Sequence, residues 1–277
     1  MGDDRPVIMV SNDDGVYSRG LKILYESVSR LGDTVVVAPE TPKSSSGLGL
    51  TLHKPLRLEE LHMWDTVVYA INGTPSDVVH LALNVLTNRI DLVVSGVNIG
   101  DNTSIQVILS SGTVGAAAQA GLLGIPAIAF SAAVSSQEDL EDDIYVSFIR
   151  KVIRELAWQV IKNGMPEGVD VINVNFPGRI DSNTRIKIAR PARLRYLEHM
   201  VERRDPLGRR YFWLYGKPVE PEKDTDVYVI LVEGNIAVTP ISFNLYPMSE
   251  KPVHELQRII DNVESRVPRH KIYSPNS

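Results

Sequence analysis

Cysteine is absent from all 277 residues of the sequence. This absence excludes disulfide bonds, zinc–thiolate sites and thiol catalysis, and it is compatible with a reducing cytosol. The sequence also lacks an apolar run long enough to span a bilayer. Its acidic first residues, MGDDRPV, lack the basic and then apolar pattern of a secretion signal. We therefore expect a cytoplasmic protein with no membrane partner.

The sequence has no excess of positive charge. Its formal net charge is −5, which argues against a general nucleic-acid coat protein, and we expect no stable complex with nucleic acid. Hydrophobic residues make up 43% and charged residues 23% of the chain, the balance of an ordinary globular protein. A sizeable core can therefore form without a metal or a disulfide.

Short apolar runs in the first two thirds of the chain predict buried strands, because a strand that is covered on both faces is apolar throughout. The predicted strands are residues 6–11, 34–39, 66–73, 91–96, 126–131 and 169–177. Helical patterns separate them, and strands that alternate with helices predict parallel βαβ units. We therefore predict an α/β fold for residues 1–185, a Rossmann-like three-layer αβα sandwich with a mostly parallel sheet.

Capping residues mark the starts of the predicted helices. Ser18 is placed to cap the first helix. In the stretch TPSD, Thr74 is the expected cap, Pro75 the first helical residue and Asp77 the acidic member of a capping box. A helix rich in small residues is expected at 111–124. A longer helix is expected to present an apolar stripe of Ile144, Phe148, Val152, Leu156 and Val160.

The sequence changes character after about residue 185. The stretch DPLG, residues 205–208, is predicted to be a turn between two extended arms. Two more strands are predicted around Gly234, and a polar helix is predicted at 251–266. Residues 186–277 are therefore treated as a separate C-terminal region that contains a hairpin, strands and a helix.

Arginines are frequent in residues 185–210. They are interpreted as a solvated face or as a hairpin paired with the acids of a partner, and the alternative is an electropositive rim that attracts polyanions. The aromatic stretch YFWLY, residues 211–215, is expected in a core or a dimer contact.

Polar loops are expected to meet at one edge of the sheet, because a parallel sheet gathers its strand ends. Asp13 and Asp14 supply hard oxygen ligands, while a serine from 44–46 and Asn98 could add neutral oxygens. Such ligands, without cysteine or a histidine cluster, suit Mg²⁺ or Mn²⁺ better than Zn²⁺. The alternative is an ordinary turn whose side chains bond to the backbone. The four loops are residues 11–15, 38–49, 95–104 and 110–115.

A second signal is the stretch SGT, which precedes a helix rich in alanine and glycine. Ser111, Gly112 and Thr113 would offer free backbone N–H groups, two hydroxyls and the positive end of a helix dipole to an anion. The alternative is an ordinary serine or threonine helix cap. Beside a metal site, the stretch is interpreted as a phosphate cradle.

Five motifs occur in order across residues 7–131: SNDDG, VVAPETPKSSSG, INGTPSD, VSGVNIGDN and SSGTVGAAAQAGLLGIPAIAFS. They resemble the survival protein E (SurE) family of metal-dependent nucleotide phosphatases, and a weaker match continues to about residue 242. The resemblance implies a 5′-nucleotidase, or acid phosphatase, with a Rossmann-like core. Its expected substrates are nucleoside 5′- or 3′-monophosphates and short polyphosphates, which it would hydrolyse with metal-activated water.

The resemblance also implies a metal site with one divalent ion per subunit, Mg²⁺ or Mn²⁺. Counting from the end of the strand at 34–39 favours Ser44 as a ligand over Ser45 and Ser46. The expected ligands are Asp13, Asp14, Ser44 and Asn98.

The expected catalytic residues are Asp13 and Asn12, with Asp13 preferred as the group that takes the proton of the attacking water. Many members of the family have an aromatic residue where this chain has Ser110, which leaves substrate preference open. The family uses its C-terminal hairpin and arm in oligomers, so a homodimer or homotetramer through residues 186–277 is expected. The phosphate is expected to face Asn12, Ser111, Gly112 and Thr113.

Proteins of other classes fit the sequence less well. A phospho-receiver signalling domain also has paired acids after its first strand, but it needs an acceptor aspartate after a central strand, where this chain has SGVN. A dinucleotide oxidoreductase would have G-x-G-x-x-G in its first turn, where two carboxylates would repel a pyrophosphate. A haloacid-dehalogenase-type phosphatase separates its two acids by one residue, whereas Asp13 and Asp14 are adjacent.

Overall fold

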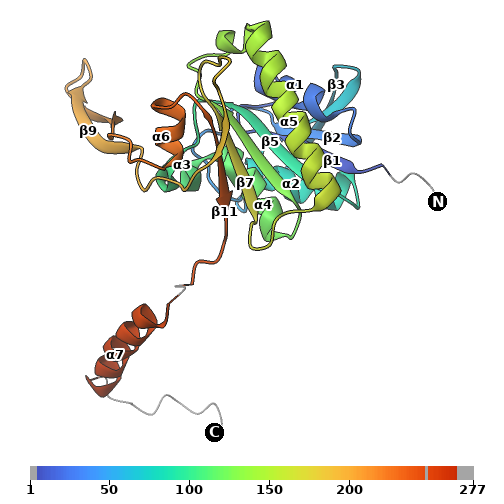
Figure 1. Cartoon of the computed structure of the whole chain (residues 1–277). Coiled ribbons are helices and arrows are strands. Elements are labelled where there is room, and N and C mark those ends of the chain that lie inside the picture. Colours follow the sequence, from blue (N-terminus) through green and yellow to red (C-terminus); the bar gives the residue numbers. More distant parts are fainter. Residues whose placement is uncertain (1–4, 247–248, 267–277) are drawn as a thin grey trace. The chain divides into compact units, whose positions relative to one another are not determined.

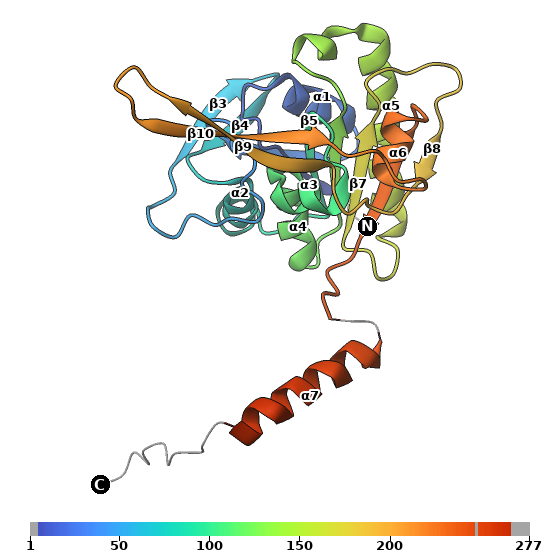
Figure 2. The same cartoon turned by 90° about the vertical axis from the view of Figure 1, so that its left-hand side faces the viewer.

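The computed structural model describes residues 5–246 and 249–266 (Figure 1). The chain divides into two compact units, Met1–Ser242 and Phe243–Ser277. In the first unit, helices cover both faces of a nine-stranded sheet (Figure 2). The predicted α/β sandwich with a mostly parallel sheet is confirmed.

The predicted buried strands form the centre of this sheet. They are β1 (Val7–Ser11), β2 (Asp33–Pro39), β4 (Thr66–Ile71), β5 (Leu92–Ile99), β6 (Ala127–Ala132) and β7 (Val171–Phe176). They pair in parallel in the order β4-β2-β1-β5-β6-β7. Because these strands are parallel, their carboxyl ends lie at one edge of the sheet.

Three further strands extend the sheet at its two sides. β3 (Leu58–Met63) is antiparallel to β4, and β11 (Ile236–Ile241) is antiparallel to β7. β8 (Ile186–Ile188) pairs with β11 in parallel. Strands β8 and β11 lie beyond residue 185, so the expected domain boundary there does not coincide with the division into compact units.

Two layers of helices cover the sheet. On one face, α1 (Arg19–Val28) packs against α5 (Asp143–Asn163). On the other face, α2 (Pro75–Leu81) packs against α4 (Gly112–Leu122), as Figure 2 shows. The short helix α3 (Ser104–Ser110) directly precedes α4. The caps expected at Ser18 and Thr74 are confirmed, since each side chain accepts a hydrogen bond from a backbone N–H in the first turn of its helix.

The buried face of α5 is turned by about one residue from the predicted stripe. Of the predicted stripe, Val160 is buried and Ile144 is 78% exposed, and the rest is partly buried against the core: Phe148, Val152 and Leu156. The most deeply buried residues of α5 include Tyr145, Ile149 and Ile153. The pattern of apolar residues on α5 is wide enough to allow either face, and packing against α1 and the sheet selects one of them.

The strand predicted before Gly234 is wrong. Residues Asp226–Leu231 form the helix α6, and only the strand after Gly234, β11, is present. The stretch DVYVIL is rich in β-branched residues, which favour strands. Thr225 caps the helix by accepting a hydrogen bond from the N–H of Tyr228 at 3.3 Å, and tertiary contacts override the local preference.

A hairpin of β9 (Tyr196–Arg204) and β10 (Arg210–Pro218) forms a separate two-stranded sheet, here called the arm. The predicted turn at 205–208 is confirmed, because the Asp205 carboxylate accepts N–H bonds from Leu207 and Arg209 at 2.9 Å each. Phe212 and Trp213 are 51% and 54% exposed on successive positions of β10. The aromatic stretch is therefore not part of the core of this chain.

The second unit contains the helix α7 (Glu250–Arg266), at the position predicted for the C-terminal helix. Its apolar residues Leu256, Ile259 and Val263 are between 50% and 59% exposed. They form an apolar stripe along one side of α7, because residues three and four positions apart share a face of a helix.

Within the described parts of the chain, no single helix is long and apolar enough to cross a membrane. The bent pair α3 and α4 reaches the required length and composition only when its two helices are taken together.

Leu24→Ala is expected to lower the free energy of unfolding by about 2–5 kcal/mol, because a buried leucine leaves a cavity that the surrounding core only partly refills. Leu24 on α1 has 0% exposure. Equilibrium chemical denaturation measures the change. The matched control is Leu52→Ala, whose side chain is 88% exposed, and there we expect a change within about 0.5 kcal/mol. Equal effects of the two substitutions would contradict the assigned core.

Candidate metal and phosphate site

The structure brings the four polar loops together at the carboxyl edge of the sheet. The N–H of Lys43 donates to the backbone carbonyl of Asp13 at 2.7 Å, and the N–H of Gly47 donates to the carbonyl of Ser110 at 2.9 Å. The hydroxyl of Thr113 donates to the carboxylate of Asp13. The loops after β1 and β2 and the junction of α3 with α4 are therefore joined by hydrogen bonds.

Asp13 lies at the end of β1 and is 3% exposed. Burial raises the pKa of its carboxyl group, and hydrogen bonds from the Thr113 side chain and from backbone groups, including those of Thr113 and Gly112, oppose that rise. The start of α4 therefore faces the carboxyl group of Asp13.

Asp14 has a buried oxygen, Oδ2, without a hydrogen-bond partner in the structure. Burial, and then the charge of Asp13, raise the pKa of Asp14 to about 6, while a backbone hydrogen bond at Ile99 lowers it. An unpartnered carboxylate oxygen beside a second acid is a costly arrangement for a purely structural turn, and a cation would satisfy it.

A bend in β5 precedes Asn98, whose neighbour Ile99 makes a backbone hydrogen bond to Asp14. The pairing of β5 with β6 shifts register between Ser95 and Asn98. Gly96 permits the bend: its φ is +129°, and a Cβ there would lie 2.1 Å from the carbonyl oxygen of Phe130. The amide nitrogen of Asn98 donates to the carbonyls of Ile99 at 3.0 Å and Gly100 at 2.8 Å. Both bonds use Nδ2, which leaves Oδ1 for a cation.

The three serines of the loop after β2 differ in burial. Ser44, which the sequence favours as a ligand, is exposed, and so is Ser45. The Oγ of Ser46 is buried without a hydrogen-bond partner in the structure. It lies 2.7 Å from the position that a Cβ on Gly112 would occupy. Ser46 therefore faces the start of α4, a distinction that the sequence alone does not make.

Gly112 is required by close approach. A Cβ at this position would lie 2.7 Å from the Cβ of Asp13 and 2.9 Å from its Oδ2. The neighbouring Ser111 accepts a hydrogen bond from the N–H of Val114 at 3.1 Å and caps α4. The helix-cap alternative is thus realised, and the glycine between the two hydroxyl residues lets the start of α4 approach Asp13 and Ser46 closely.

Asn12 orders the turn that carries the acids. It is fully buried, and its Nδ2 donates to the Oγ of Ser18 at 2.6 Å and to the carbonyl of Gly15 at 3.2 Å. Its Oδ1 accepts the N–H of Gly15 at 3.2 Å. A contact between Asn12 and phosphate stays a prediction.

The motif GTPSD has a second role that the sequence did not reveal. Besides the capping box, the hydroxyl of Thr74 donates to the carbonyl of Gly49 at 2.6 Å, and the carboxylate of Asp77 accepts the N–H of Thr51 at 3.0 Å. These bonds hold Gly49 and Thr51, at the far end of the loop after β2 that contains the three serines, here called the serine loop. The cap residues therefore also stabilise a loop of the candidate site.

Sequence reasoning also missed a set of buried polar side chains below the loop after β5. Asn175 on β7 accepts the N–H of Asn102 at 2.7 Å, and Asn173 donates to the carbonyl of Asn102 at 2.8 Å. The side chain of Asn102 donates to Ser131 on β6 at 2.8 Å. These buried polar groups could have been predicted from the two asparagines in the otherwise apolar strand sequence VINVNF.

The donor set at this edge fits a hard divalent cation. Two carboxylates, an amide oxygen and a serine hydroxyl are oxygen ligands of the kind that Mg²⁺ and Mn²⁺ prefer. Among the described residues, no group of three or more His, Cys, Asp or Glu side chains could hold a metal ion. A site here would therefore depend on neutral oxygens in addition to the two acids.

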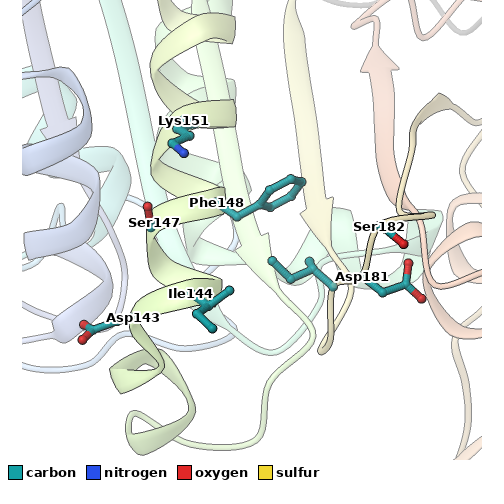
Figure 3. A pocket seen from close by; sticks show the side chains of 8 residues that line it. Asp143, Ile144, Ser147, Phe148, Lys151, Asp181 and Ser182 are labelled. Atoms are coloured by element: carbon teal, nitrogen blue, oxygen red, sulfur yellow. The ribbon is translucent and has the colours of Figure 1, made fainter.

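A separate cavity of about 750 Å³ lies between α5 and the loop after β7. Figure 3 shows Phe148 of α5 extending toward this loop, with Asp143 and Lys151 on the same helix. The cavity shares no residue with the candidate site, and its lining carries no adjacent pair of acids.

The profile of the family described as Survival protein SurE matches residues 8–198. The chain belongs to the SurE family. Two SurE relatives are named 5′-nucleotidase SurE. The protein of Hyperthermus butylicus is 57% identical over 240 residues, which cover 86% of this chain and 85% of that protein. The protein of Thermofilum pendens is 50% identical over 262 residues, which cover 95% and 99% respectively.

A solved SurE structure agrees with the fold. The crystal structure of the SurE protein from Aquifex aeolicus matches with a TM-score of 0.75 and 34% sequence identity, and the match covers 94% of this chain and 100% of that one. The structural similarity therefore includes residues of the C-terminal region as well as the central strands.

Asp14→Asn is expected to stabilise the metal-free SurE chain at pH 7 by about 1–3 kcal/mol, because it removes a partly desolvated charge. The pKa of Asp14 is raised from 3.8 to about 6 in the fold. Between pH 3.8 and about 6, Asp14 binds more protons in the folded state than in the unfolded state. The free energy of unfolding therefore falls as the pH rises through this range. Urea unfolding in the presence of a chelator, at several pH values, measures both effects.

The control for this prediction is Asp65→Asn, since Asp65 is exposed, and we expect a change within about 0.5 kcal/mol. A loss of stability in Asp14→Asn at pH 7 would show that Asp14 is a structural turn residue.

Proposed function

We propose that this chain is a metal-dependent phosphomonoesterase that hydrolyses nucleoside 5′-monophosphates to nucleoside and phosphate. The observation that carries the proposal is the unpartnered Oδ2 of Asp14 next to Asp13, which itself faces the start of α4 at Gly112. The relatives named 5′-nucleotidase support the choice of nucleotides as substrate. Nucleoside 3′-monophosphates and short polyphosphates are further proposed substrates.

The proposed ligands of one Mg²⁺ or Mn²⁺ per subunit are Asp13, Asp14, Ser44 and Asn98. Such an ion, when bound, polarises a phosphoryl oxygen and lowers the pKa of a water bound to it. The exposed Ser44 is free to turn toward an ion, whereas the buried Oγ of Ser46 already faces Gly112. We therefore assign Ser46 to the phosphate side of the site.

The start of α4 is proposed to hold the phosphoryl group. The dipole of the 11-residue helix α4 favours an anion at this end, where backbone groups of Gly112 and Thr113 bond to Asp13 in the ligand-free chain. The hydroxyl of Ser111 adds a donor for phosphate. The Thr113 hydroxyl donates to Asp13 and the Asn12 amide donates to Ser18 and Gly15, so each would have to exchange a bond to contact phosphate. Donors fixed in this way stabilise charge on the equatorial oxygens as the transition state forms.

Asp13 is proposed to accept the proton of the attacking water. Its burial raises its pKa, which makes it a better base than an exposed aspartate. Thr113 holds the carboxylate in place through its hydroxyl. Asn12 keeps the turn in register by bonding to Gly15 and Ser18. No covalent intermediate is needed, because water attacks the phosphorus directly.

A phospho-receiver domain is the alternative that the sequence left open. The loop after the central strand β5 offers Asn98 where a receiver needs an acceptor aspartate. The relatives reported above are named as nucleotidases, so no observation favours this alternative.

A second copy of the chain is the proposed partner. The arm exposes Phe212, Trp213 and Leu214 by 51%, 54% and 56%, and α7 exposes a further apolar stripe. Side chains of this size and kind are enriched in subunit interfaces. We propose a homodimer or homotetramer through these elements, in a cytoplasmic protein without a membrane or nucleic-acid partner.

Asp13→Ala is expected to lower kcat/KM for a nucleoside 5′-monophosphate by about 10³-fold, because it removes both a ligand and the proton acceptor. Phosphate release from a panel of 5′- and 3′-monophosphates and tripolyphosphate, with Mg²⁺, with Mn²⁺ or with chelator, measures this effect. Asp65→Ala is the control and is expected to behave like the unmodified protein. Full activity after chelation, or in Asp13→Ala, would refute the proposal.

Ser44→Ala is expected to weaken Mn²⁺ binding by about tenfold, the effect of losing one supporting oxygen at a metal site. Ser46→Ala is expected to leave Mn²⁺ binding unchanged and to weaken the binding of inorganic phosphate. Titration calorimetry with each ligand separates the two serines. The reverse result would move the hydroxyl ligand to Ser46.

A further inference from the structure

The start of α3 is held by segments that lie far away in the sequence. Thr103, at the cap position, makes no capping bond with its side chain. Instead, the N–H of Ser104 donates to Asp226 of α6 at 2.8 Å. The next two N–H groups donate to carbonyls of the segment before the arm: Ile105 to Ala192 at 2.7 Å, and Gln106 to Arg193 at 3.3 Å. A helix of seven residues is marginal by itself, so these bonds fix its position.

The side chain of Gln106 continues this attachment into the arm. Its Oε1 accepts the N–H groups of Arg195 and Tyr196 at 3.0 Å each. Its Nε2 donates to the carbonyl of Tyr196 at 3.1 Å and to the carboxylate of Glu198 at 3.3 Å. The amide thus bonds to the first residues of β9 in the way that a neighbouring strand would. Residues 192–196 are called the arm base below.

A buried ion pair joins the same two segments. The Nε of Arg195 lies 3.5 Å from the Oδ1 of Asp101, and the two side chains are only 9% and 10% exposed. Thr103 also donates to Asp101 through its hydroxyl. Asp226 joins the arm base as well, since it accepts the N–H of Ala192 at 2.9 Å. The loop after β5, α3, α6 and the arm base therefore form one connected polar network.

The other end of α3 leads directly into the site. Ser110 is its last residue, and its carbonyl accepts the N–H of Gly47 from the serine loop. The next residue, Ser111, is both the C-cap of α3 and the N-cap of α4. A shift of α3 would therefore move the 111–113 turn, which also bonds to Asp13 through Thr113. The backbone that carries Asp13 and Asp14 follows β1, a strand paired with β2 and β5 and not with α3.

We propose that Gln106 is a positioning residue for phosphate binding, through which the arm base fixes α3 and hence the 111–113 turn. This inference rests on the proposed function, because it assigns the turn to phosphate. It gives the arm a role at the active site besides any contact with a second copy: a change at the arm base alters phosphate binding without touching a metal ligand.

The test compares Gln106→Ala with the unmodified chain. Loss of four hydrogen bonds is expected to raise KM for a nucleoside 5′-monophosphate and the Ki of inorganic phosphate about tenfold, because small misplacements of binding groups are costly. We expect kcat to stay within about threefold and Mn²⁺ affinity within about twofold, since the backbone that carries Asp13 and Asp14 follows β1, a strand that does not pair with α3. Gln106→Glu keeps the two accepted bonds but places a carboxylate oxygen against the Tyr196 carbonyl and the Glu198 carboxylate, so it is expected to raise KM and Ki as well.

The matched control is Gln159→Ala on α5, an exposed glutamine that accepts one bond from Asn163 at 2.9 Å. It is expected to leave all four quantities unchanged. If Gln106→Ala does not fold, Gln106→Glu is judged by the same criteria. Unchanged KM and Ki in a folded variant would overturn the inference, and so would a loss confined to kcat or to Mn²⁺ affinity.

Direct binding of inorganic phosphate, followed by calorimetry, separates this inference from the proposed function. If the unmodified chain hydrolyses no nucleotide, the proposed function fails. The positioning role is then still supported by weaker phosphate binding in Gln106→Ala, and it is refuted by equal binding.

Discussion

Two adjacent carboxylates at the end of a buried strand are the constraint on which the site depends. Burial raises the pKa of both groups, and the charge of Asp13 raises that of Asp14 further. Thr113 donates a hydrogen bond to Asp13, but Oδ2 of Asp14 has no hydrogen-bond partner in the structure. A turn selected only for stability would avoid this arrangement. The residues at this edge therefore favour ligand binding over the stability of the ligand-free chain.

Topology explains why the acids lie where they do. The order β4-β2-β1-β5-β6-β7 places β1 in the middle, and the chain builds outward from it, first toward β2 and β4 and then toward β5 and β6. The chain leaves β1 for α1 on one face of the sheet and leaves β5 for α3 and α4 on the other, and ligands of such sheets bind where the connections divide in this way. Asp14 follows β1, and Asn98 is the last residue but one of β5, so both lie at this edge.

The sequence predicted those parts that depend on local pattern. Six apolar runs correspond to six strands, and the caps at Ser18 and Thr74 are present, because both signals are carried by neighbouring residues. The helix α6 could not be predicted in this way, because Asp226 is held by N–H groups of Ser104 and Ala192, which are distant in sequence. The burial of Ser46 likewise depends on how two loops pack. Local signals thus located the acids, but not the network that surrounds them.

The close approach at Gly112 has a consequence for how this site can vary. A single added methyl group would meet the backbone-proximal carbon of Asp13 and the oxygen of Ser46 at 2.7 Å each. Every other amino acid brings at least that methyl group, so a substitution here would have to move Asp13 or Ser46. The backbone of α4 can thus come this near to the acid only because its first residue has no side chain, and the size of one atom sets the distance between two parts of the fold.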